Sequence, residues 1–323
     1  MADKDYSFIT LRTANGCSLE LVTEFGGLTN RLQLVGPRGP IDVIVGLADR
    51  NAMITDRAYR NIPLFPLVNR LDAGRYKHLG KEYQLPINEP ERNNALHGFI
   101  QKYVPQVQLA EGENTSEAIL TYHYDGGLEG YPFPAEVRIH YVLHSSGGLD
   151  ISYSVLNRHT ESIPVGVGWH PYFGLGEPLD TLRMQLPEVR FVTIDERMLP
   201  LGTTEAYTHF HKPTLIGDTQ LDHCFVIQRS PESSNPQASD AAIATTVLWS
   251  DKQQIGLKIW QQTGARALNY IQVCTAPDRQ SIAIEPVSCS INAFNTGDGL
   301  VVLEPEGFFT AHMGVHLLTQ LET

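Results

Sequence analysis

The sequence contains few cysteines, no long apolar run and no excess of basic residues. The four cysteines form no C-x-x-C pair, which excludes a zinc ribbon and a dithiol redox motif. No apolar run approaches the roughly 18 residues of a membrane-spanning helix, and the N-terminus lacks the apolar segment of a secretory signal. The net charge of −12 disfavours a nucleic-acid partner, because binding to phosphates requires a basic surface. We therefore expect a cytoplasmic protein that binds neither nucleic acid nor a membrane.

Sequence motifs of several large enzyme classes are also missing. There is no G-x-x-x-x-G-K-[ST] phosphate loop, no G-x-G-x-x-G dinucleotide motif and no G-x-S-x-G nucleophile motif. His209 and His211 form an H-x-H pair with no third ligand at a fixed spacing, so we interpret them as ordinary polar residues. The sequence therefore predicts no cofactor and no metal.

Short segments with the alternation of β-strands fill most of the chain, separated by 27 glycines and 20 prolines. Between two of these segments, the link from His144 to Gly148 ends in the two glycines of a hairpin loop. No window shows the apolar stripe of an amphipathic helix. The pattern predicts an all-β antiparallel fold, either a sandwich or a barrel. The expected strands are 6–13, 17–22, 41–47, 117–124, 136–143, 149–156, 189–195, 223–228, 243–249, 255–260, 267–274 and 301–304.

No shift in composition marks a domain boundary, so we expect one domain across residues 1–323. The one segment of low complexity, 230–240, is too short for a domain linker and is interpreted as a mobile surface loop. No internal repeat is found, which argues against a propeller. The sequence leaves open whether the protein is a monomer or a homodimer.

Two segments place polar residues where a buried strand would not favour them. The apolar stretch that starts at Asn61 ends in Asn69-Arg70, and an arginine in such surroundings needs a partner. That partner is either a structural salt bridge or the oxygens of a ligand, and the local sequence favours neither. Further on, His97 is followed by Gly98, which is typical of a loop whose backbone approaches a ligand closely.

Two further segments end in a residue suited to proton transfer. Gly166, Gly168 and His170 share one face of an expected strand, which predicts open space for a ligand beside the imidazole. Glu285 lies on an apolar strand with only a small alanine on its own face, and burial would raise the pKa of such a carboxylate. Glu285 is therefore a candidate general base, although a solvated glutamate at a sheet rim has the same local pattern.

Together these segments resemble the aldose 1-epimerase (galactose mutarotase) family, from Asn61 to the C-terminus. The matching motifs follow one another in the family's order, and five in register are far more specific than any one of them. They are Asn69-Arg70-Leu71 with the following G-K-x-Y-x-L-x-x-N pattern to Asn88, Leu96-His97-Gly98, His170-Pro171-Tyr172-Phe173, Asp222-His223-Cys224-Phe225 and Glu285-Pro286. The resemblance implies a large, single-domain antiparallel β-sandwich and an isomerase that acts on a small sugar without a cofactor.

The resemblance also implies a role for each matching residue. Glu285 would take the proton from the C1 hydroxyl of a pyranose, and His170 would protonate the ring oxygen as the C1–O5 bond breaks. The aldehyde then rotates, and the two residues exchange roles as the ring closes. His97, Arg70 and Asp222 would orient the sugar, with Asn69 beside them. Since one group must be ionised and the other protonated, we expect a bell-shaped pH profile, with a nearby carboxylate raising the pKa of His170.

The chain departs from the galactose-type pattern around the motif histidine. Gly168-Trp169 precedes it where Thr-Asn is usual, and Gly174 replaces an asparagine, which marks a divergent branch of the family. Trp169 is thereby a candidate sugar-binding residue. Three alternatives stay open: a hexose-6-phosphate mutarotase that uses arginines such as Arg57, Arg60 or Arg75, a non-catalytic carbohydrate-binding protein on the same fold, and a glycosidase that pairs Glu285 with Asp222.

Overall fold

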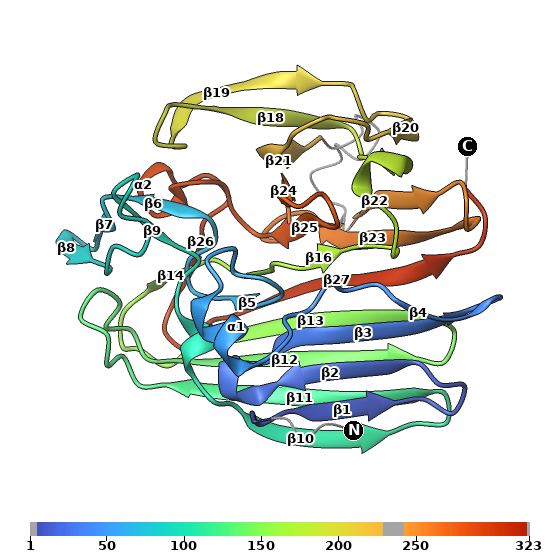
Figure 1. Cartoon of the computed structure of the whole chain (residues 1–323). Helices are drawn as coiled ribbons and strands as arrows, with labels where there is room; N and C mark the ends of the chain where they lie inside the picture. Colours follow the sequence, from blue (N-terminus) through green and yellow to red (C-terminus); the bar gives the residue numbers. More distant parts are fainter. Residues whose placement is uncertain (1–4, 229–241, 322–323) are drawn as a thin grey trace.

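The computed structural model describes residues 5–228 and 242–321. Strands dominate it, and every pair of neighbouring strands runs antiparallel, as the register of each shows. The predicted all-β antiparallel fold is confirmed, and it is a sandwich rather than a barrel, because the strands form separate open sheets (Figure 1). The segment 230–240, interpreted above as a surface loop, lies outside the described residues.

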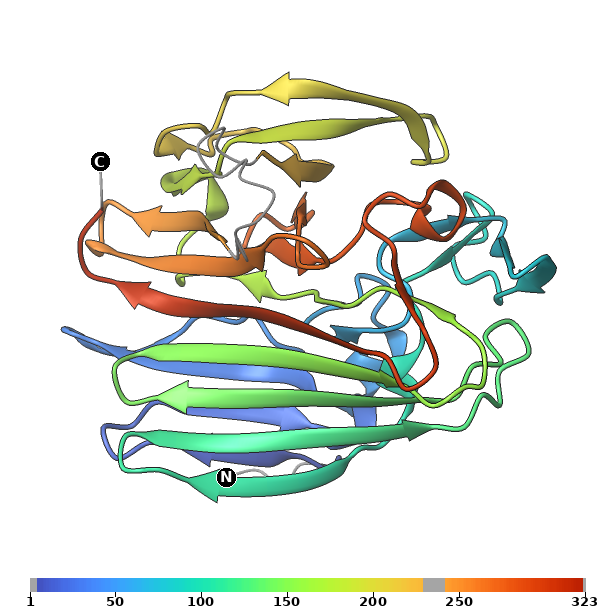
Figure 2. The same ribbon diagram turned by 180° about the vertical axis from the view of Figure 1, so that it is seen from behind.

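The largest sheet has nine strands and runs through the middle of the molecule. Strand β27 is hydrogen-bonded to β13 on one side and to β23 on the other, so it joins the two halves of this sheet (Figure 2). In sheet order the strands are β10 (Gln106–Glu111), β11 (Thr115–Tyr124), β12 (Ala135–His144), β13 (Gly148–Asn157), β27 (Phe308–Leu318), β23 (Ile255–Thr263), β22 (Ala242–Ser250), β17 (Leu182–Gln185) and β20 (Thr214–Leu215).

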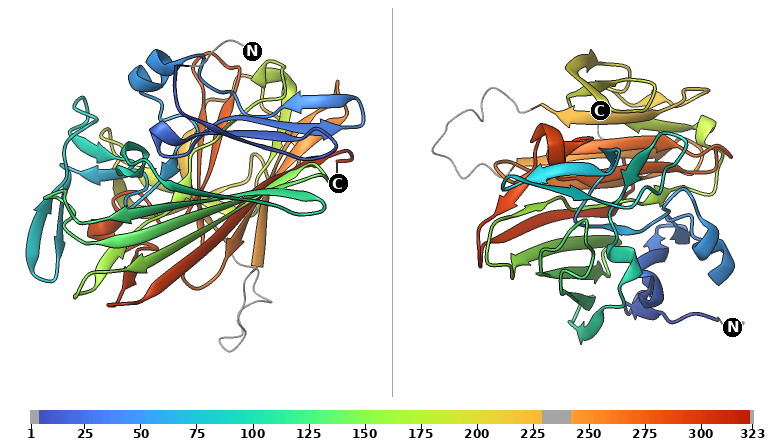
Figure 3. Two further views of the ribbon diagram at one scale, coloured as in Figure 1. Left: turned by 90° about the horizontal axis from the view of Figure 1, so that it is seen from below. Right: turned by 90° about the vertical axis from the view of Figure 1, so that its left-hand side faces the viewer.

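A second sheet of four strands covers the β11–β13 half of the large sheet (Figures 1 and 3). Its strands are β1 (Ile9–Arg12), β2 (Ser18–Val22), β3 (Leu28–Gly36) and β4 (Gly39–Asp42). The Tyr122 hydroxyl of the large sheet donates a hydrogen bond to the Gly26 carbonyl between β2 and β3. The two layers therefore share one apolar interior, in which Leu19 and Leu32 are fully buried.

A third sheet of eight strands carries Glu285, Asp222 and Trp169, and His170 directly follows one of its strands. Its order is β19 (Pro200–Tyr207), β18 (Val189–Ile194), β21 (Asp222–Ile227), β24 (Tyr270–Thr275), β25 (Ile282–Val287), β15 (Gly168–Trp169) and β5 (Pro63–Leu64), and β16 (Tyr172–Phe173) also pairs with β25. Three pairs complete the strands: β6 (Arg70–Asp72) with β9 (Asn94–Leu96), β7 (Arg75–His78) with β8 (Lys81–Gln84), and β14 (Ile163–Val165) with β26 (Val301–Leu303).

Helices are short, as expected from the missing helical pattern. They are α1 (Arg50–Thr55), α2 (Ala293–Thr296) and the 3-10 turns η1 (Thr23–Phe25), η2 (Ile100–Lys102) and η3 (Leu179–Thr181). The Asp49 side chain caps α1 by accepting a hydrogen bond from the backbone N–H of Ala52. None of the helices in the described part of the chain has the length and apolar character to cross a bilayer.

The alternation read from the sequence is visible in the long strands. In β12 the side chains of Val137, Ile139, Tyr141 and Leu143 are fully buried, whereas those between them are more exposed. The predicted hairpin at 144–148 is confirmed, with His144 opposite Gly148. The expected strand 41–47 was wrong beyond Asp42, where β4 ends. Strands β3, β10, β19 and β27 were not anticipated, nor were several of the shorter strands.

Candidate active site

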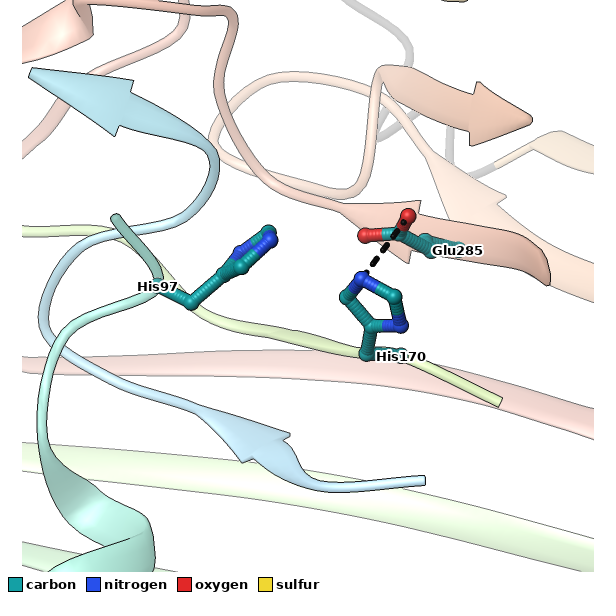
Figure 4. Close-up of side chains that lie close together, drawn as sticks. All are labelled: His97, His170 and Glu285. Atoms are coloured by element: carbon teal, nitrogen blue, oxygen red, sulfur yellow. Dashed lines mark ion pairs between the residues drawn. The ribbon is translucent and has the colours of Figure 1, made fainter. Parts of the chain in front are cut away.

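Three buried side chains from distant parts of the chain point toward one another (Figure 4). His97 follows β9, His170 follows β15, and Glu285 lies within β25. They border a cavity of about 140 Å³. Its other walls are formed by Arg57, Ala58, Tyr59, Asn69, Arg70, Leu96, Tyr172, Asp222, Gln272 and Cys274. The structure thus brings six of the seven predicted site residues to one cavity.

Strand register places His170 opposite Glu285. Gly168 pairs with Val287 and Tyr172 with Ala283, and the same register between these two pairs sets His170 against Glu285. The distance between His170 Nε2 and Glu285 Oε1 is 3.3 Å, and both side chains are almost fully buried. An imidazole and a carboxylate at this distance can exchange a proton directly.

The glycines near His170 bring strands together rather than leaving space for a ligand. A Cβ atom on Gly168 would lie 2.7 Å from Val287 Cγ1 and 2.8 Å from the Pro286 carbonyl oxygen. A Cβ atom on Gly166 would lie 3.0 Å from Cys289 Sγ. The expectation of an open concavity beside these glycines was therefore wrong. Their small size instead permits the close approach of β15 to β25 that holds the acid–base pair.

His97 and Asn69 are held by the end of the β6–β9 pair. Both have left-handed backbones, with φ of 60° and 56°, a conformation that asparagine and histidine adopt more readily than most non-glycine residues. The His97 N–H donates to the Asn69 carbonyl at 3.1 Å, and the His97 ring stands edge-on to His170 with centroids 4.8 Å apart. A Cβ on Gly98 would lie 2.4 Å from the Phe65 carbonyl oxygen. The expected close approach at Gly98 is thus to Phe65 and not to a ligand.

Arg70 makes a structural salt bridge and also borders the cavity. Its Nε and Nη2 donate to the two carboxylate oxygens of Glu89 at 2.9–3.1 Å, in a buried pair. The Arg70 Nη1 group has no hydrogen-bond partner among residues 5–228 and 242–321. Of the two interpretations left open by the sequence, the salt bridge is therefore confirmed, and the remaining nitrogen is available to a ligand oxygen.

A chain of hydrogen bonds orients three further polar side chains that border the cavity, those of Asn69, Gln272 and Asp222. Asn69 Nδ2 donates to Gln272 Oε1 at 2.9 Å, and Gln272 Nε2 donates to Asp222 Oδ1 at 2.7 Å. Gln272 is also the cross-strand neighbour of Glu285. Gln272 was missed by sequence reasoning, although a polar residue in the expected strand 267–274 was the available signal. Through these two hydrogen bonds, Gln272 orients the side chains of Asn69 and Asp222 at the cavity wall.

Trp169 lies away from this cavity. Its side chain is 1% exposed and packs edge-to-face on Phe173, with ring centroids 5.7 Å apart. Successive side chains of an extended strand point to opposite faces, so the residue before His170 faces the apolar interior. The prediction that Trp169 binds the sugar directly therefore receives no support from its position.

Burial shifts the pKa value of each of the three central groups in the direction that favours the neutral form of that group. It raises the pKa of Glu285 well above the usual value, with the nearby Asp222 carboxylate acting in the same direction and Arg70 opposing. It lowers the pKa of His170 to about 4 and that of His97 well below the usual value. The sequence led us to expect a raised pKa for His170, which was wrong because desolvation by burial dominates and the nearby Arg60 lowers the pKa further. Burial therefore favours a carboxylic acid at Glu285 beside an unprotonated imidazole at His170, a pair that together carries a single proton.

Two more residues complete the wall of the cavity, and neither was predicted as a site residue from the sequence motifs. The Tyr59 ring stands edge-on to His97, its hydroxyl accepts a hydrogen bond from Asn88, and its φ is 52°. Arg57 lies beside it and forms no ion pair within the described residues. Neither residue belongs to a motif that we recognised as part of the site, although Arg57 was named among the arginines able to bind a phosphate. His209 and His211 belong to no cluster of three metal-ligating side chains in the described part of the chain.

The structure is thus a β-sandwich with a buried carboxylate–imidazole pair at the wall of its cavity. The profile of the aldose 1-epimerase family matches residues 7–316, and the chain belongs to this family. The chain is 30% identical to the uncharacterized protein YihR of Escherichia coli over 75% of its own length and 73% of that protein. It is 29% identical to galactose mutarotase of Rattus norvegicus over 65% of each.

Solved structures with the same fold cover almost the whole chain. A galactose mutarotase-like protein from Clostridium acetobutylicum superposes with a TM-score of 0.82 at 18% identity, over 98% of this chain and 99% of that one. Galactose 1-epimerase from Lactobacillus acidophilus gives 0.79 at 18% identity, over 99% and 97%. These likenesses establish the fold, while the identity of about 30% to curated relatives marks a divergent member of the family.

Proposed function

We propose that the protein is an aldose 1-epimerase that interconverts the α and β anomers of a free hexose. The observation that carries the proposal is the His170–Glu285 contact of 3.3 Å at the wall of the cavity. Anomerisation requires one group to remove a proton from the C1 hydroxyl while another protonates the ring oxygen. A pair that holds a single proton supplies both functions.

In the proposed reaction, protons pass between the sugar and the two residues Glu285 and His170. Transfer of the shared proton to His170 leaves Glu285 ionised, and the carboxylate accepts the proton of the C1 hydroxyl. His170 donates its proton to O5, the C1–O5 bond breaks, and an open-chain aldehyde forms. After rotation about C1–C2, the hydroxyl on O5 attacks the other face of the carbonyl. Glu285 now donates and His170 accepts, so the enzyme returns to its starting protonation state.

Residues around the pair bind the hydroxyl groups in this scheme. The free Nη1 of Arg70 and the oriented Asn69 amide donate hydrogen bonds, whereas Asp222 accepts them. His97 stands edge-on to His170 and limits how far the sugar ring can shift away from the pair. Such positioning contributes to rate because it holds the reacting atoms in a near-attack geometry.

Anomerisation of freshly dissolved α-D-glucose and α-D-galactose, followed by polarimetry or NMR exchange, tests the proposal. Glu285→Gln and His170→Gln should each lower kcat by about 10²–10⁴-fold, the usual contribution of a general acid or base. Glu306→Gln and His123→Gln are matched controls on exposed side chains and should retain full activity. Unchanged kcat in Glu285→Gln would contradict the mechanism. Binding without any acceleration would indicate a carbohydrate-binding protein, and cleavage of nitrophenyl glycosides a hydrolase.

A sugar with an anionic substituent, such as a hexose 6-phosphate, is the second candidate substrate. The observation in its favour is Arg57, which borders the cavity without an ion-pair partner among the described residues. Lys102 borders an adjoining cavity that Arg57 also lines. If this candidate is correct, Arg57→Gln lowers kcat/KM much more for hexose 6-phosphates than for neutral hexoses. An equal loss for both classes contradicts it.

A further inference from the structure

The three central side chains also form a set of metal-ligating groups. One ligand atom from each of His97, His170 and Glu285 lies within 4.8 Å of the others. The three side chains come from distant parts of the chain and converge from different directions (Figure 4). Two imidazoles and one carboxylate are a donor set that zinc uses in catalytic sites, whereas magnesium and calcium prefer oxygen ligands.

The spacing of the donors fits a tetrahedral ion after a small adjustment. With zinc–ligand bonds of about 2.0–2.2 Å, two donors on one tetrahedral ion lie roughly 3.3–3.6 Å apart. His170 Nε2 and Glu285 Oε1 already have this separation, at 3.3 Å. Only His97 has to approach. Its Nδ1 is buried and has no hydrogen-bond partner among the described residues, so the ring can turn without breaking a hydrogen bond at that atom.

We propose that a zinc-like divalent ion binds His97, His170 and Glu285 and thereby competes with the sugar. The cavity provides the entry path, and its remaining space leaves a fourth position for water. The partly buried Asp222 carboxylate attracts a cation to this wall, and Arg70 opposes it. While the ion is bound, neither His170 nor Glu285 can exchange protons with a substrate. The ion is therefore an inhibitor and not a cofactor.

The surroundings of the ligands also predict that binding is reversible. Metal-ligating histidines usually donate their second ring N–H to a carboxylate or carbonyl, and loss of that contact weakens binding by about 10–100-fold. The Nδ1 atoms of both His97 and His170 lack such a partner in the described part of the chain. The site accordingly holds zinc more weakly than a dedicated structural site, and a chelator should remove the ion without unfolding the protein.

Binding is measured on the full chain, treated first with EDTA, by the visible absorption of Co²⁺ and by calorimetric titration with Zn²⁺. We expect one ion per chain with the absorption of tetrahedral cobalt, and no comparable binding of Mg²⁺. Glu285→Gln and His97→Asn should each weaken binding by at least about tenfold. Asparagine is chosen at position 97 because it tolerates the left-handed backbone. His316→Ala is the control, since His316 pairs with Asp150 on another sheet.

Two results would overturn the proposal: no binding of Co²⁺ or Zn²⁺, or binding that is as tight in both cavity variants as in the unaltered protein. In a protein that accelerates anomerisation, Zn²⁺ should also inhibit, and saturating sugar should raise the apparent dissociation constant of Zn²⁺. The absorption is recorded without sugar, so metal binding is tested even if the proposed mutarotase activity fails. Conversely, activity unaffected by bound Zn²⁺ would refute competition while leaving the mutarotase proposal intact.

Discussion

Replacement of Gly168 by alanine should increase the distance between His170 and Glu285, although neither of these two residues is itself changed. The new methyl group would lie 2.7 Å from Val287 Cγ1 and 2.8 Å from the Pro286 carbonyl oxygen, on the strand that carries Glu285. The carbonyl belongs to the backbone, so rotation of a side chain cannot relieve this contact. β15 and β25 must therefore move apart.

The size of the movement sets the expected effect. To bring the new methyl group to an ordinary van der Waals distance from Val287 and Pro286, the two strands must move apart by roughly 0.6 Å. If the shift is transmitted to the adjacent His170, the 3.3 Å contact with Glu285 lengthens to roughly 4 Å, beyond direct proton transfer. Misplacement of reacting groups by about 1 Å can cost 10²-fold in rate, so we expect kcat to fall by about 10–100-fold. Overpacking should also reduce the free energy of unfolding by about 1–3 kcal/mol.

Both quantities are measured on the same protein preparation. Denaturant titration gives the stability, and NMR exchange of the anomers gives kcat under conditions where the variant is fully folded. Gly127→Ala is the control, because Gly127 is exposed and the atoms nearest to a Cβ there belong to the flexible carboxylate of Asp125. A Gly168→Ala variant that folds and keeps the wild-type kcat would refute the argument that close strand approach holds the pair.

Three further predictions concern the same cavity. Activity should require the singly protonated His170–Glu285 pair: it falls below about pH 4, where His170 also takes up a proton, and at high pH, where the raised pKa of Glu285 is passed, as a kcat profile would show. Glu89→Ala leaves the buried Arg70 guanidinium without its partner and should destabilise the protein by about 3–5 kcal/mol in urea titrations. Gln272→Ala removes two hydrogen bonds that orient cavity side chains, and KM should rise by about tenfold.

Each of these predictions has a result that contradicts it. A kcat that does not change between pH 3.5 and 7 would exclude the assigned protonation states. Glu82→Ala is the control for Glu89, because Glu82 and Lys77 form an exposed ion pair whose loss should cost at most about 1 kcal/mol. Equal losses in Glu82→Ala and Glu89→Ala would show that burial does not matter there. An unchanged KM in Gln272→Ala would show that the hydrogen-bond chain does not orient the sugar.

Local alternation predicted the fold class well, because half-buried strands in antiparallel sheets repeat with a period of two residues. Strands β11 to β13 and their hairpin could be predicted for this reason. The same signal is present in β27, where Phe309, Ala311, Met313 and Val315 are buried, but histidines and glycine between them obscured it. The boundaries of β4 were missed because pairing, and not composition, decides where a strand ends.

The site was predictable only as far as sequence motifs reach. The motifs identified His97, His170 and Glu285, but the 3.3 Å contact depends on strand register, which no local pattern specifies. The function of Gly168 was misjudged for the same reason: the atoms that a Cβ would meet belong to a strand more than a hundred residues away. Trp169 could have been excluded, because alternation already placed it on the opposite face from its neighbour.

The position of β27 has a consequence for the order in which the molecule forms during synthesis. This strand, Phe308–Leu318, pairs with β13 and β23, and it follows both in the chain. Until β27 has been synthesised, β13 and β23 lack the strand that joins them, so each would present an open edge able to pair with other chains. Glu285 has emerged by then, so all candidate site residues are present before the sheet can close. Newly made chains should therefore depend on chaperones most strongly at this late stage.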